Sequence, residues 1–193
     1  ILLSFLLTIL LGSLLLSLPI SSAGEEAVPF LDALFTATTS TCVTGLVTLP
    51  TVSTWSVFGQ AVILVLIQVG GLGVITIMSG LMILLNKKMG VNDILLIQDA
   101  FNLNTMAGLA DFVKNVVFGT LIIEGIGAAL YMFVFIPEFG PRGIWISVFT
   151  SVSAFCNAGI DIIAENSLCN YATNALVNIV TSFLIILGGL GYI

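Results

Sequence analysis

The sequence contains no histidine, and only four basic and ten acidic residues occur among its 193 residues. Charged residues make up 7% of the chain and hydrophobic residues 59%, whereas a soluble domain is about 25% charged and about 45–50% apolar. So few charges cannot solvate the surface of a compact soluble fold, and a chain this apolar is not disordered. The net charge of −6 excludes a nucleic-acid-binding face, which needs clustered Lys and Arg. We therefore expect the chain to lie in a membrane, in contact with lipid.

The same scarcity argues against an enzyme. Without histidine, neither a Ser-His-Asp triad nor a Cys-His pair can form, and the acidic residues are too scattered to make a catalytic pair. The three cysteines, Cys42, Cys156 and Cys169, cannot all pair, and their spacing matches neither a zinc module nor a disulfide scaffold. We interpret Cys42 and Cys156 as small packing residues. We expect no catalytic residue, no covalently bound cofactor and no structural metal centre.

Four long apolar segments are present, and a helix needs about 20 residues to cross the hydrocarbon core. They are residues 1–20, 55–85, 113–136 and 171–193. The first could instead be a signal peptide, but it has no basic start and its apolar stretch is too long, so we favour a spanning helix. The second exceeds the thickness of the core and must tilt, bend or protrude. Because the chain begins with Ile1 and ends inside an apolar run, we interpret it as a piece of a longer protein.

Two shorter apolar segments, residues 30–41 and 145–156, are rich in Ser and Thr and are too short to cross a membrane. Each is followed by a loop that contains glycine, which is typical of a re-entrant helix leading into exposed backbone. Between the two halves, residues 89–112 are the most polar part of the chain. Their apolar residues are spaced for an amphipathic helix on the membrane surface.

The chain repeats itself when residue n is laid over residue n+114. Cys42 then meets Cys156, and Gly45-Leu46 meets Gly159-Ile160. With a small further insertion, the Gly-Gly-Leu-Gly of residues 70–73 meets that of residues 188–191. The predicted fold is an all-α membrane protein with two repeated units of spanning helix, re-entrant pore helix, extended filter loop and spanning helix. The predicted domains are a first unit at 1–85, a cytoplasmic connector at 86–112 and a second unit at 113–193.

A half-crossing helix followed by an extended glycine loop suits the binding of a dehydrated cation. Backbone carbonyls can replace the hydration shell of the ion, and glycine permits the positive φ that turns them toward one axis. Thr44 can add a hydroxyl oxygen. Neutral oxygen ligands suit an alkali cation better than a divalent one. The C-terminal end of the short helix, where the helix dipole is negative, favours a cation at the same place.

The motifs resemble those of the bacterial KtrB/TrkH potassium-uptake subunits of the Trk/Ktr/HKT superfamily. They are FTA at 35–37, CVTGL at 42–46, Gln60, IQVGGLG at 67–73 and SAFCNAG at 153–159. The family has four such units, called M1–P–M2, around one pore in one polypeptide, so this chain would be the first two. The resemblance implies that Gly45 and Gly159 are filter glycines. It also implies that potassium-binding carbonyls come from Val43, Thr44, Asn157 and Ala158.

The resemblance further implies a multi-pass protein of the plasma membrane that takes up potassium, driven or tuned by sodium in some members. Its implied partners are the remaining two repeats of the same polypeptide, a second copy in a homodimer, and a cytoplasmic ring of nucleotide-binding regulatory subunits of the RCK type. Residues 89–112 would dock that ring. The rival hypothesis is a multi-span carrier or membrane scaffold of other specificity. Two further glycine-loop repeats in the rest of the gene would decide between the two.

Two features keep two interpretations each. Gly70, Gly71 and Gly73 could belong to the ion path, but we favour a surface for close helix packing. Glu124 is the one charge in the middle of a predicted spanning segment. A charge there indicates either a functional group or a hydrogen-bonded structural one, and the sequence does not decide between them.

The basic residues predict the topology. Lys87, Lys88 and Lys114 flank the polar stretch 89–112, and Arg142 stands alone beyond the next predicted span. By the positive-inside rule the connector is cytoplasmic, and the loops with Glu25, Glu26, Glu138 and Glu165 are extracellular. A cysteine placed at Ser22 should therefore react with a membrane-impermeant thiol reagent added to intact cells, and a cysteine at Asn92 should not. Labelling of Asn92→Cys from outside would reverse the assignment.

Overall fold

The computed structural model describes residues 2–24, 27–73 and 109–190. Its helices in these ranges are α1 (Leu2–Leu16), α2 (Phe30–Thr41), α3 (Thr51–Thr54), α4 (Val57–Leu72), α7 (Leu109–Phe139), α8 (Arg142–Phe155) and α9 (Ala175–Gly189). Two 3-10 turns, η1 (Pro19–Ser21) and η2 (Ser167–Tyr171), join them. No strand occurs in the described ranges, where a single isolated bridge links Ser22 to Trp55. The prediction of an all-α protein is confirmed.

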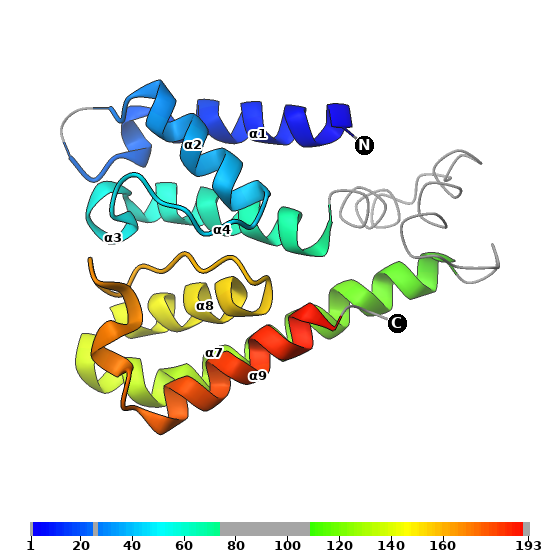
Figure 1. Cartoon of the computed structure of the whole chain (residues 1–193), viewed down its shortest axis with the longest axis vertical. Helices are drawn as coiled ribbons and strands as arrows, with labels where there is room; N and C mark the ends of the chain where they lie inside the picture. Colours follow the sequence, from blue (N-terminus) through cyan, green and yellow to red (C-terminus); the bar gives the residue numbers. More distant parts are fainter. Residues whose placement is uncertain (1, 25–26, 74–108, 191–193) are drawn as a thin grey trace.

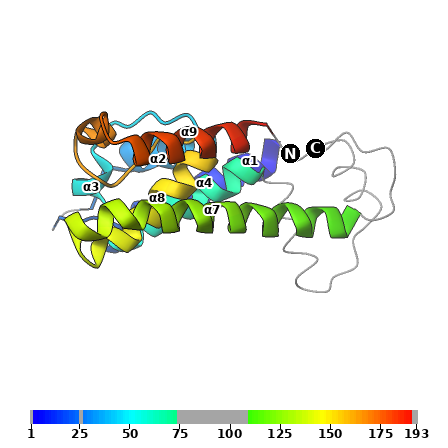
Figure 2. The same cartoon turned by 90° about the horizontal axis from the view of Figure 1, so that it is seen from below.

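Six of these helices, all except α3, form two groups of three. In the first group α1, α2 and α4 pack on one another, and in the second α7, α8 and α9 do so. Figure 1 shows the first group above the second, and α4 contacts α8 where the groups meet. Figure 2 shows α7 extending along the whole length of the helical body. Each group therefore consists of one Ser/Thr-rich helix, α2 or α8, packed against two more apolar ones.

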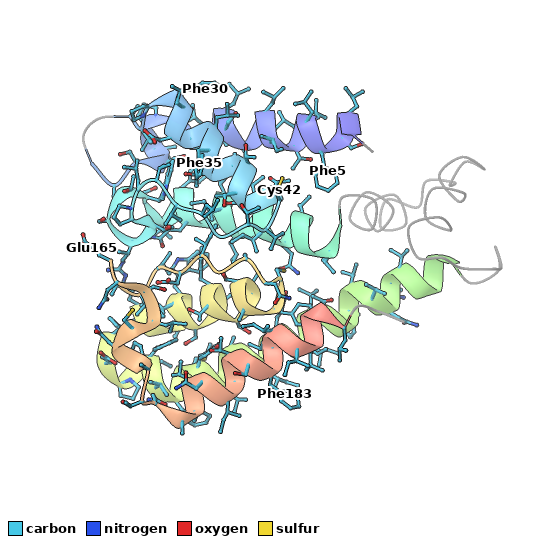
Figure 3. All side chains as sticks on the ribbon, in the orientation of Figure 1. Phe5, Phe30, Phe35, Cys42, Glu165 and Phe183 are labelled. Carbon is cyan, nitrogen blue, oxygen red and sulfur yellow. The ribbon has the colours of Figure 1, made fainter. Side chains whose placement is uncertain are left out.

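The outer faces of both groups are apolar. Leu3, Phe30 and Phe183 are among many large hydrophobic side chains that remain exposed, and Figure 3 shows Phe30 and Phe183 on opposite sides of the molecule. A surface of this kind suits lipid or further protein, because water does not solvate it. Within the described residues, one helical stretch, Val113–Phe139, is long and apolar enough to cross a membrane. Shorter apolar stretches occur in α1, α4 and α9.

The helix α2 has the predicted bounds, and its hydroxyls explain how a Ser/Thr-rich segment can be buried. Pro29 lies just before the helix as its N-cap residue, and its carbonyl accepts the Ala33 N–H at 3.0 Å. Thr38 Oγ1 donates to the Leu34 carbonyl at 2.7 Å, and Ser40 Oγ donates to the Thr36 carbonyl at 2.6 Å. These bonds within the helix satisfy the hydroxyls of Thr38 and Ser40 without water.

Several predicted boundaries in the second half are wrong. The predicted segment 113–136 was to stop before Pro137, but α7 continues through it to Phe139. A proline in the last turn removes only one backbone hydrogen bond, and Gly140, at φ +61°, then closes the helix with its N–H on the Ile136 carbonyl at 2.8 Å. The helix also begins at Leu109, inside the predicted connector.

The next two helices start at other residues than predicted. The short helix predicted at 145–156 begins earlier, at Arg142. The last helix begins later than the predicted Tyr171, because Ser167–Tyr171 form a 3-10 turn. Asn174 caps α9, since its side-chain oxygen accepts the Val177 N–H at 3.2 Å. Residues 74–85 of the predicted segment 55–85 lie outside the described residues. So do residues 86–108 of the predicted connector, with most of its predicted surface helix and docking face.

Glycines let the long helices approach the ends of the short ones. A Cβ on Gly70 of α4 would lie 2.1 Å from the Thr41 carbonyl oxygen at the end of α2. A Cβ on Gly188 of α9 would lie 1.8 Å from the Phe155 carbonyl oxygen at the end of α8. Gly71 leaves similar room for Cys156 Sγ, at 2.4 Å. The interpretation of Gly70 and Gly71 as a close packing surface is confirmed, while Gly73, at φ +81°, ends α4.

Replacing Gly70 by alanine should therefore destabilise the protein, because backbone atoms on both sides would have to separate. We expect Gly70→Ala to lower the stability of the folded full-length protein in detergent by about 1–3 kcal/mol. Gly125→Ala is the matched control on α7, since no atom lies within 4 Å of its Cβ position. Thermal unfolding of both variants measures the difference, and equal melting temperatures would contradict the packing argument.

Candidate functional site

The candidate site consists of two loops, each at the C-terminal end of a short helix. Loop 1 (residues 42–46) follows α2, and loop 2 (residues 156–160) follows α8. In loop 1, Val43 and Gly45 have φ values of +55° and +74°, with Thr44 between them not in the positive region. Alternation of this kind aims successive peptide groups to the same side of the chain, which is how exposed backbone forms ion-binding surfaces.

Loop 2 has the same backbone pattern. Asn157 and Gly159 have φ values of +60° and +71°, and Ala158 between them is not in the positive region. The positive φ of both glycines agrees with the sequence-based expectation. The positive φ at Val43 and Asn157 was missed. For Asn157 the signal was available, because asparagine tolerates this region, whereas a β-branched residue such as Val43 is an outlier there. Such strain persists only where the surroundings hold it, which is common at ligand sites.

The loops are held by backbone hydrogen bonds that recur at the offset of 114 residues. The Thr44 N–H donates to the Thr39 carbonyl at 3.0 Å, and the Ala158 N–H donates to the Ser153 carbonyl at 2.8 Å. The bonds just before them recur in the same way, from Cys42 to Thr38 at 2.8 Å and from Cys156 to Val152 at 2.9 Å. The N–H groups are thus turned back toward the helix end.

A hydroxyl on each short helix ties the far end of its loop. In loop 1, Thr39 Oγ1 lies 2.7 Å from Thr44 Oγ1 and accepts the Leu46 N–H at 3.0 Å. At the corresponding positions of loop 2, Ser153 Oγ donates to the Ile160 carbonyl at 2.5 Å. The same two positions are joined in both loops through different atoms. Each loop is therefore closed over the last turn of its helix.

The two loops lie directly against each other. A Cβ on Gly45 would be 2.5 Å from the Ala158 carbonyl oxygen and 3.7 Å from Gly159 Cα. Gly159 has more room, because the nearest atom to its Cβ position is Gly45 Cα at 3.9 Å. All six residues predicted for the site therefore lie in one contiguous patch of backbone. Gly45 is required there for two reasons, its positive φ and its close contact, and Gly159 for one.

The electrostatics of the patch favour a cation. Loops 1 and 2 contain no charged side chain, so their oxygen atoms come from carbonyls, from the Thr44 hydroxyl and from the Asn157 amide. Both α2 and α8 end at the patch, and the C-terminal end of a helix carries partial negative charge. Asn157 and Thr44 are exposed, whereas Ala158 is buried.

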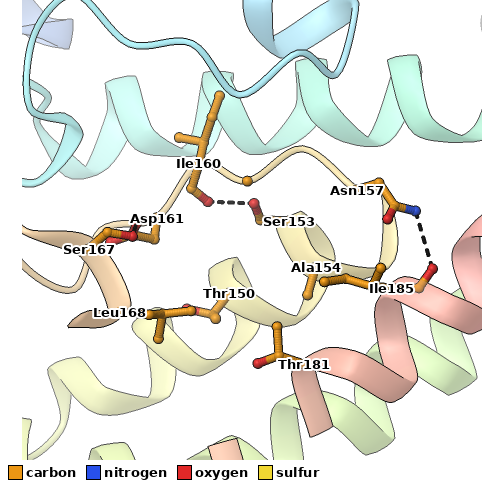
Figure 4. Close-up of a pocket in the computed structure, with 11 residues that line it drawn as sticks. Thr150, Ser153, Ala154, Asn157, Ile160, Asp161, Ser167, Leu168, Thr181 and Ile185 are labelled. Carbon is orange, nitrogen blue, oxygen red and sulfur yellow. Dashed lines mark hydrogen bonds between the residues drawn. The ribbon is translucent and has the colours of Figure 1, made fainter. Parts of the chain in front are cut away.

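A pocket of about 160 Å³ lies behind loop 2, between α8 and α9 (Figure 4). At the edge of this pocket, Asn157 Nδ2 donates a hydrogen bond to the Ile185 carbonyl at 3.4 Å, which links loop 2 to α9. Asp161, just after loop 2, accepts the Ile163 N–H at 3.1 Å and the Ser167 hydroxyl. These bonds fix the chain on the far side of loop 2.

The predicted packing role of the two cysteines holds for one of them. Cys156 is buried against Gly71, whereas Cys42 is exposed at the end of α2 (Figure 3). Among the residues that the structure describes, no three His, Cys, Asp or Glu side chains gather at one point. The cysteines beside the two loops therefore differ in their surroundings although they correspond in sequence.

An all-helical body with an apolar outer surface is typical of the class of helical membrane proteins. The chain belongs to the TrkH family of cation transport proteins, whose sequence profile matches residues 6–193. It is 43% identical to the potassium/sodium uptake protein NtpJ of Enterococcus hirae over 98% of this chain, and 40% identical to the Ktr system potassium uptake protein B of Bacillus subtilis over 97%. Identity to the Ktr system potassium uptake protein B of Vibrio alginolyticus is 33% over the whole chain.

In each of these three comparisons the chain covers 42% of the relative's length. The relatives are described as transport proteins and not as enzymes, which agrees with the expectation from the sequence. Membership of the family also makes the chain part of a membrane protein.

We predict that the Thr39 hydroxyl holds loop 1 against the last turn of α2. Thr39→Val removes the acceptor for the Leu46 N–H and the partner of Thr44 Oγ1, at nearly constant volume. We expect a loss of about 1–3 kcal/mol and faster hydrogen exchange of the Leu46 amide, because its N–H loses its partner. Thr38→Val is the control, because the Thr38 hydroxyl bonds only within α2. Equal exchange in the two variants would refute the closure.

Proposed function

We propose that the protein to which this chain belongs takes up potassium across the plasma membrane, and that the chain supplies half of the pore and of its selectivity filter. The observation that carries this proposal is the pair of adjoining loops with alternating φ, each at the C-terminal end of a short helix. Relatives described as potassium uptake proteins support the choice of ion.

The short helices are proposed to be re-entrant pore helices. They have 12 and 14 residues, which at about 1.5 Å per residue gives about 18 and 21 Å, well below a hydrocarbon core of about 30 Å. Exposed backbone at membrane depth is tolerated where it lines a cavity, so a loop reached by a half-crossing helix fits a pore. The hydrogen bonds that recur at 114 residues support two repeated M1–P–M2 units, the first at 1–85 and the second at 113–193.

The proposed ligands are backbone carbonyls. Those of Val43 and Thr44 in loop 1, and of Asn157 and Ala158 in loop 2, would replace water around a dehydrated potassium ion. Gly45 and Gly159 would permit the backbone conformation. Sodium is proposed as a coupling or second transported ion, since the Enterococcus hirae relative is described as a potassium/sodium uptake protein.

The whole transporter is proposed to contain more than this chain. Two loops supply half of a ring of about four that would surround the ion, so the remaining two repeats of the polypeptide would complete it. The relatives named after a Ktr system support work with other subunits. We propose that these are RCK-type nucleotide-binding subunits docked on residues 89–112 of the cytoplasmic connector, and that the assembly is a homodimer.

The first test concerns Gly45. Gly45→Ser in the full-length protein should lower the preference for potassium over sodium about tenfold, because its Cβ would both oppose the φ of +74° and push on the Ala158 carbonyl. Uptake of the two ions by cells lacking other potassium uptake, normalised to protein abundance, measures this. Gly140→Ser is a matched control with φ +61° and no atom within 4 Å. Wild-type selectivity in Gly45→Ser would remove Gly45 from the filter.

The second test concerns the number of loops. The 193-residue chain, purified alone and reconstituted in liposomes, should show no selective potassium flux as a monomer, because half of the ligand ring is missing. The full-length protein in the same liposomes is the positive control. Selective flux through a demonstrated monomer would contradict the four-loop arrangement.

A further inference from the structure

Glu124 is a buried acidic side chain for which the proposed pore has no use. It lies in α7, has only 4% of its surface exposed, and is the one charged residue buried within the described residues. Gln68 of α4 donates from Nε2 to both of its carboxyl oxygens, at 3.0 and 3.3 Å. Because α4 belongs to the first helix group and α7 to the second, this bond joins the two groups.

Glu124 also contacts the helix end from which loop 2 begins. Cys156 Sγ lies 3.9 Å from Glu124 Oε1, and Ser151 Oγ of α8 donates to the Glu124 main-chain carbonyl at 2.7 Å. Cys156 directly precedes Asn157 of loop 2 and fills the space that Gly71 leaves on α4. Three helices, α4, α7 and α8, therefore meet at this carboxyl group.

The pair does not belong to the repeated pattern. The alignment that places Pro19 on Pro137 places Leu6 on Glu124, and the alignment of the two Gly-Gly-Leu-Gly motifs places Ile186 on Gln68. Both corresponding residues are apolar and exposed. The hydrogen bond between Gln68 and Glu124 thus belongs to the contact between the groups and has no counterpart at the corresponding positions.

A second polar link holds the same two groups nearer the start of α4. Trp145 Nε1 of α8 donates to Gln60 Oε1 at 2.9 Å, and Gln60 Nε2 donates to the Trp55 carbonyl at 3.0 Å. Apolar contacts tolerate sliding and rotation, but a buried donor and acceptor match in only one register. The two links therefore fix the position of α4 relative to α8, and the link at Glu124 does so next to loop 2.

We propose that Gln68 and Glu124 are a pair of positioning residues that sets loop 2 in register with loop 1 and thereby determines ion selectivity; the selectivity part of this inference rests on the proposed function. Neither residue has to touch the ion. The Glu124 carboxyl group accepts hydrogen bonds from Gln68 and from Cys156, and through Cys156 it holds the end of α8 where loop 2 begins. Its shape and its acceptor atoms therefore matter more than its charge.

The test distinguishes hydrogen-bond acceptance by Glu124 from an effect of its charge, in the full-length protein. Glu124→Gln keeps the size and one acceptor oxygen, so potassium-over-sodium selectivity should stay within about twofold of wild type, whereas Glu124→Leu and Gln68→Leu should each lower it about fivefold. Equal losses in Glu124→Gln and Glu124→Leu would assign the effect to charge and overturn the positioning role. Unchanged selectivity in both leucine variants would overturn it as well.

A double variant separates positioning from mere stability. In Gln68→Leu/Glu124→Leu both members of the Gln68–Glu124 hydrogen bond are removed together and only the weak thiol donor of Cys156 loses its acceptor, so the melting temperature should recover relative to the single leucine variants. Selectivity should stay low, because nothing fixes the register. Recovery of both would mean that the pair only stabilises the fold. Tyr131→Phe is the control, since it breaks a buried hydrogen bond to Thr181 inside the second group and should leave selectivity unchanged.

Thiol labelling tests the same inference without any transport measurement. With the other cysteines of the full-length protein replaced by serine, buried Cys156 should react slowly in the wild type and in Glu124→Gln. It should react several-fold faster in Glu124→Leu. Unchanged labelling in Glu124→Leu would refute the positioning of Cys156, whatever the ion. If Cys156 is labelled faster in Glu124→Leu but the wild-type protein shows no preference for potassium, the proposed function is refuted. The contact between Glu124 and Cys156 then still stands.

Discussion

The structure depends on keeping exposed backbone satisfied in an apolar surrounding. Loops 1 and 2 place peptide groups where neither a helix nor a sheet pairs them, and each unpaired group away from water would cost several kcal/mol. The N–H groups of Thr44 and Ala158 are satisfied by hydrogen bonds to the carbonyls of Thr39 and Ser153. The hydroxyls of Thr39 and Ser153 close the loops. What remains free in such an arrangement is carbonyl oxygen, which is the atom that a cation needs.

The other features of each helix group follow from this need. A loop can fold back on its helix only if the helix ends nearby, so the short helices stop after 12 and 14 residues. The neighbouring helices approach the last carbonyls of α2 and α8 closely. They can do so because Gly70 and Gly188 have no side chain at these contacts. The Ser and Thr content of α2, which would be unfavourable in an ordinary apolar helix, provides hydroxyls that bond locally.

The contact between the groups follows another logic. Within a group, glycine and small residues set the distance by shape, whereas between α4 and the second group Gln60 and Gln68 set the register by hydrogen bonds. The proposed ring of repeated units would need both kinds of contact. Shape alone would let one unit slide along the next, and adjoining loops such as those at Gly45 and Ala158 would lose their alignment.

The sequence by itself determined the helical class, the positive φ of Gly45 and Gly159, the bounds of α2 and the packing role of Gly70 and Gly71. These properties are local or compositional: hydropathy, the length of an apolar run, and a motif repeated after 114 residues. Other features were decided only by the tertiary structure, because they depend on what a residue meets. Pro137 stays inside α7 since its place in the last turn costs one bond, and Val43 keeps a positive φ since α2 and loop 1 hold it. The partner of Glu124 lies 56 residues away on another helix, and only the packing of the two groups brings Gln68 to it.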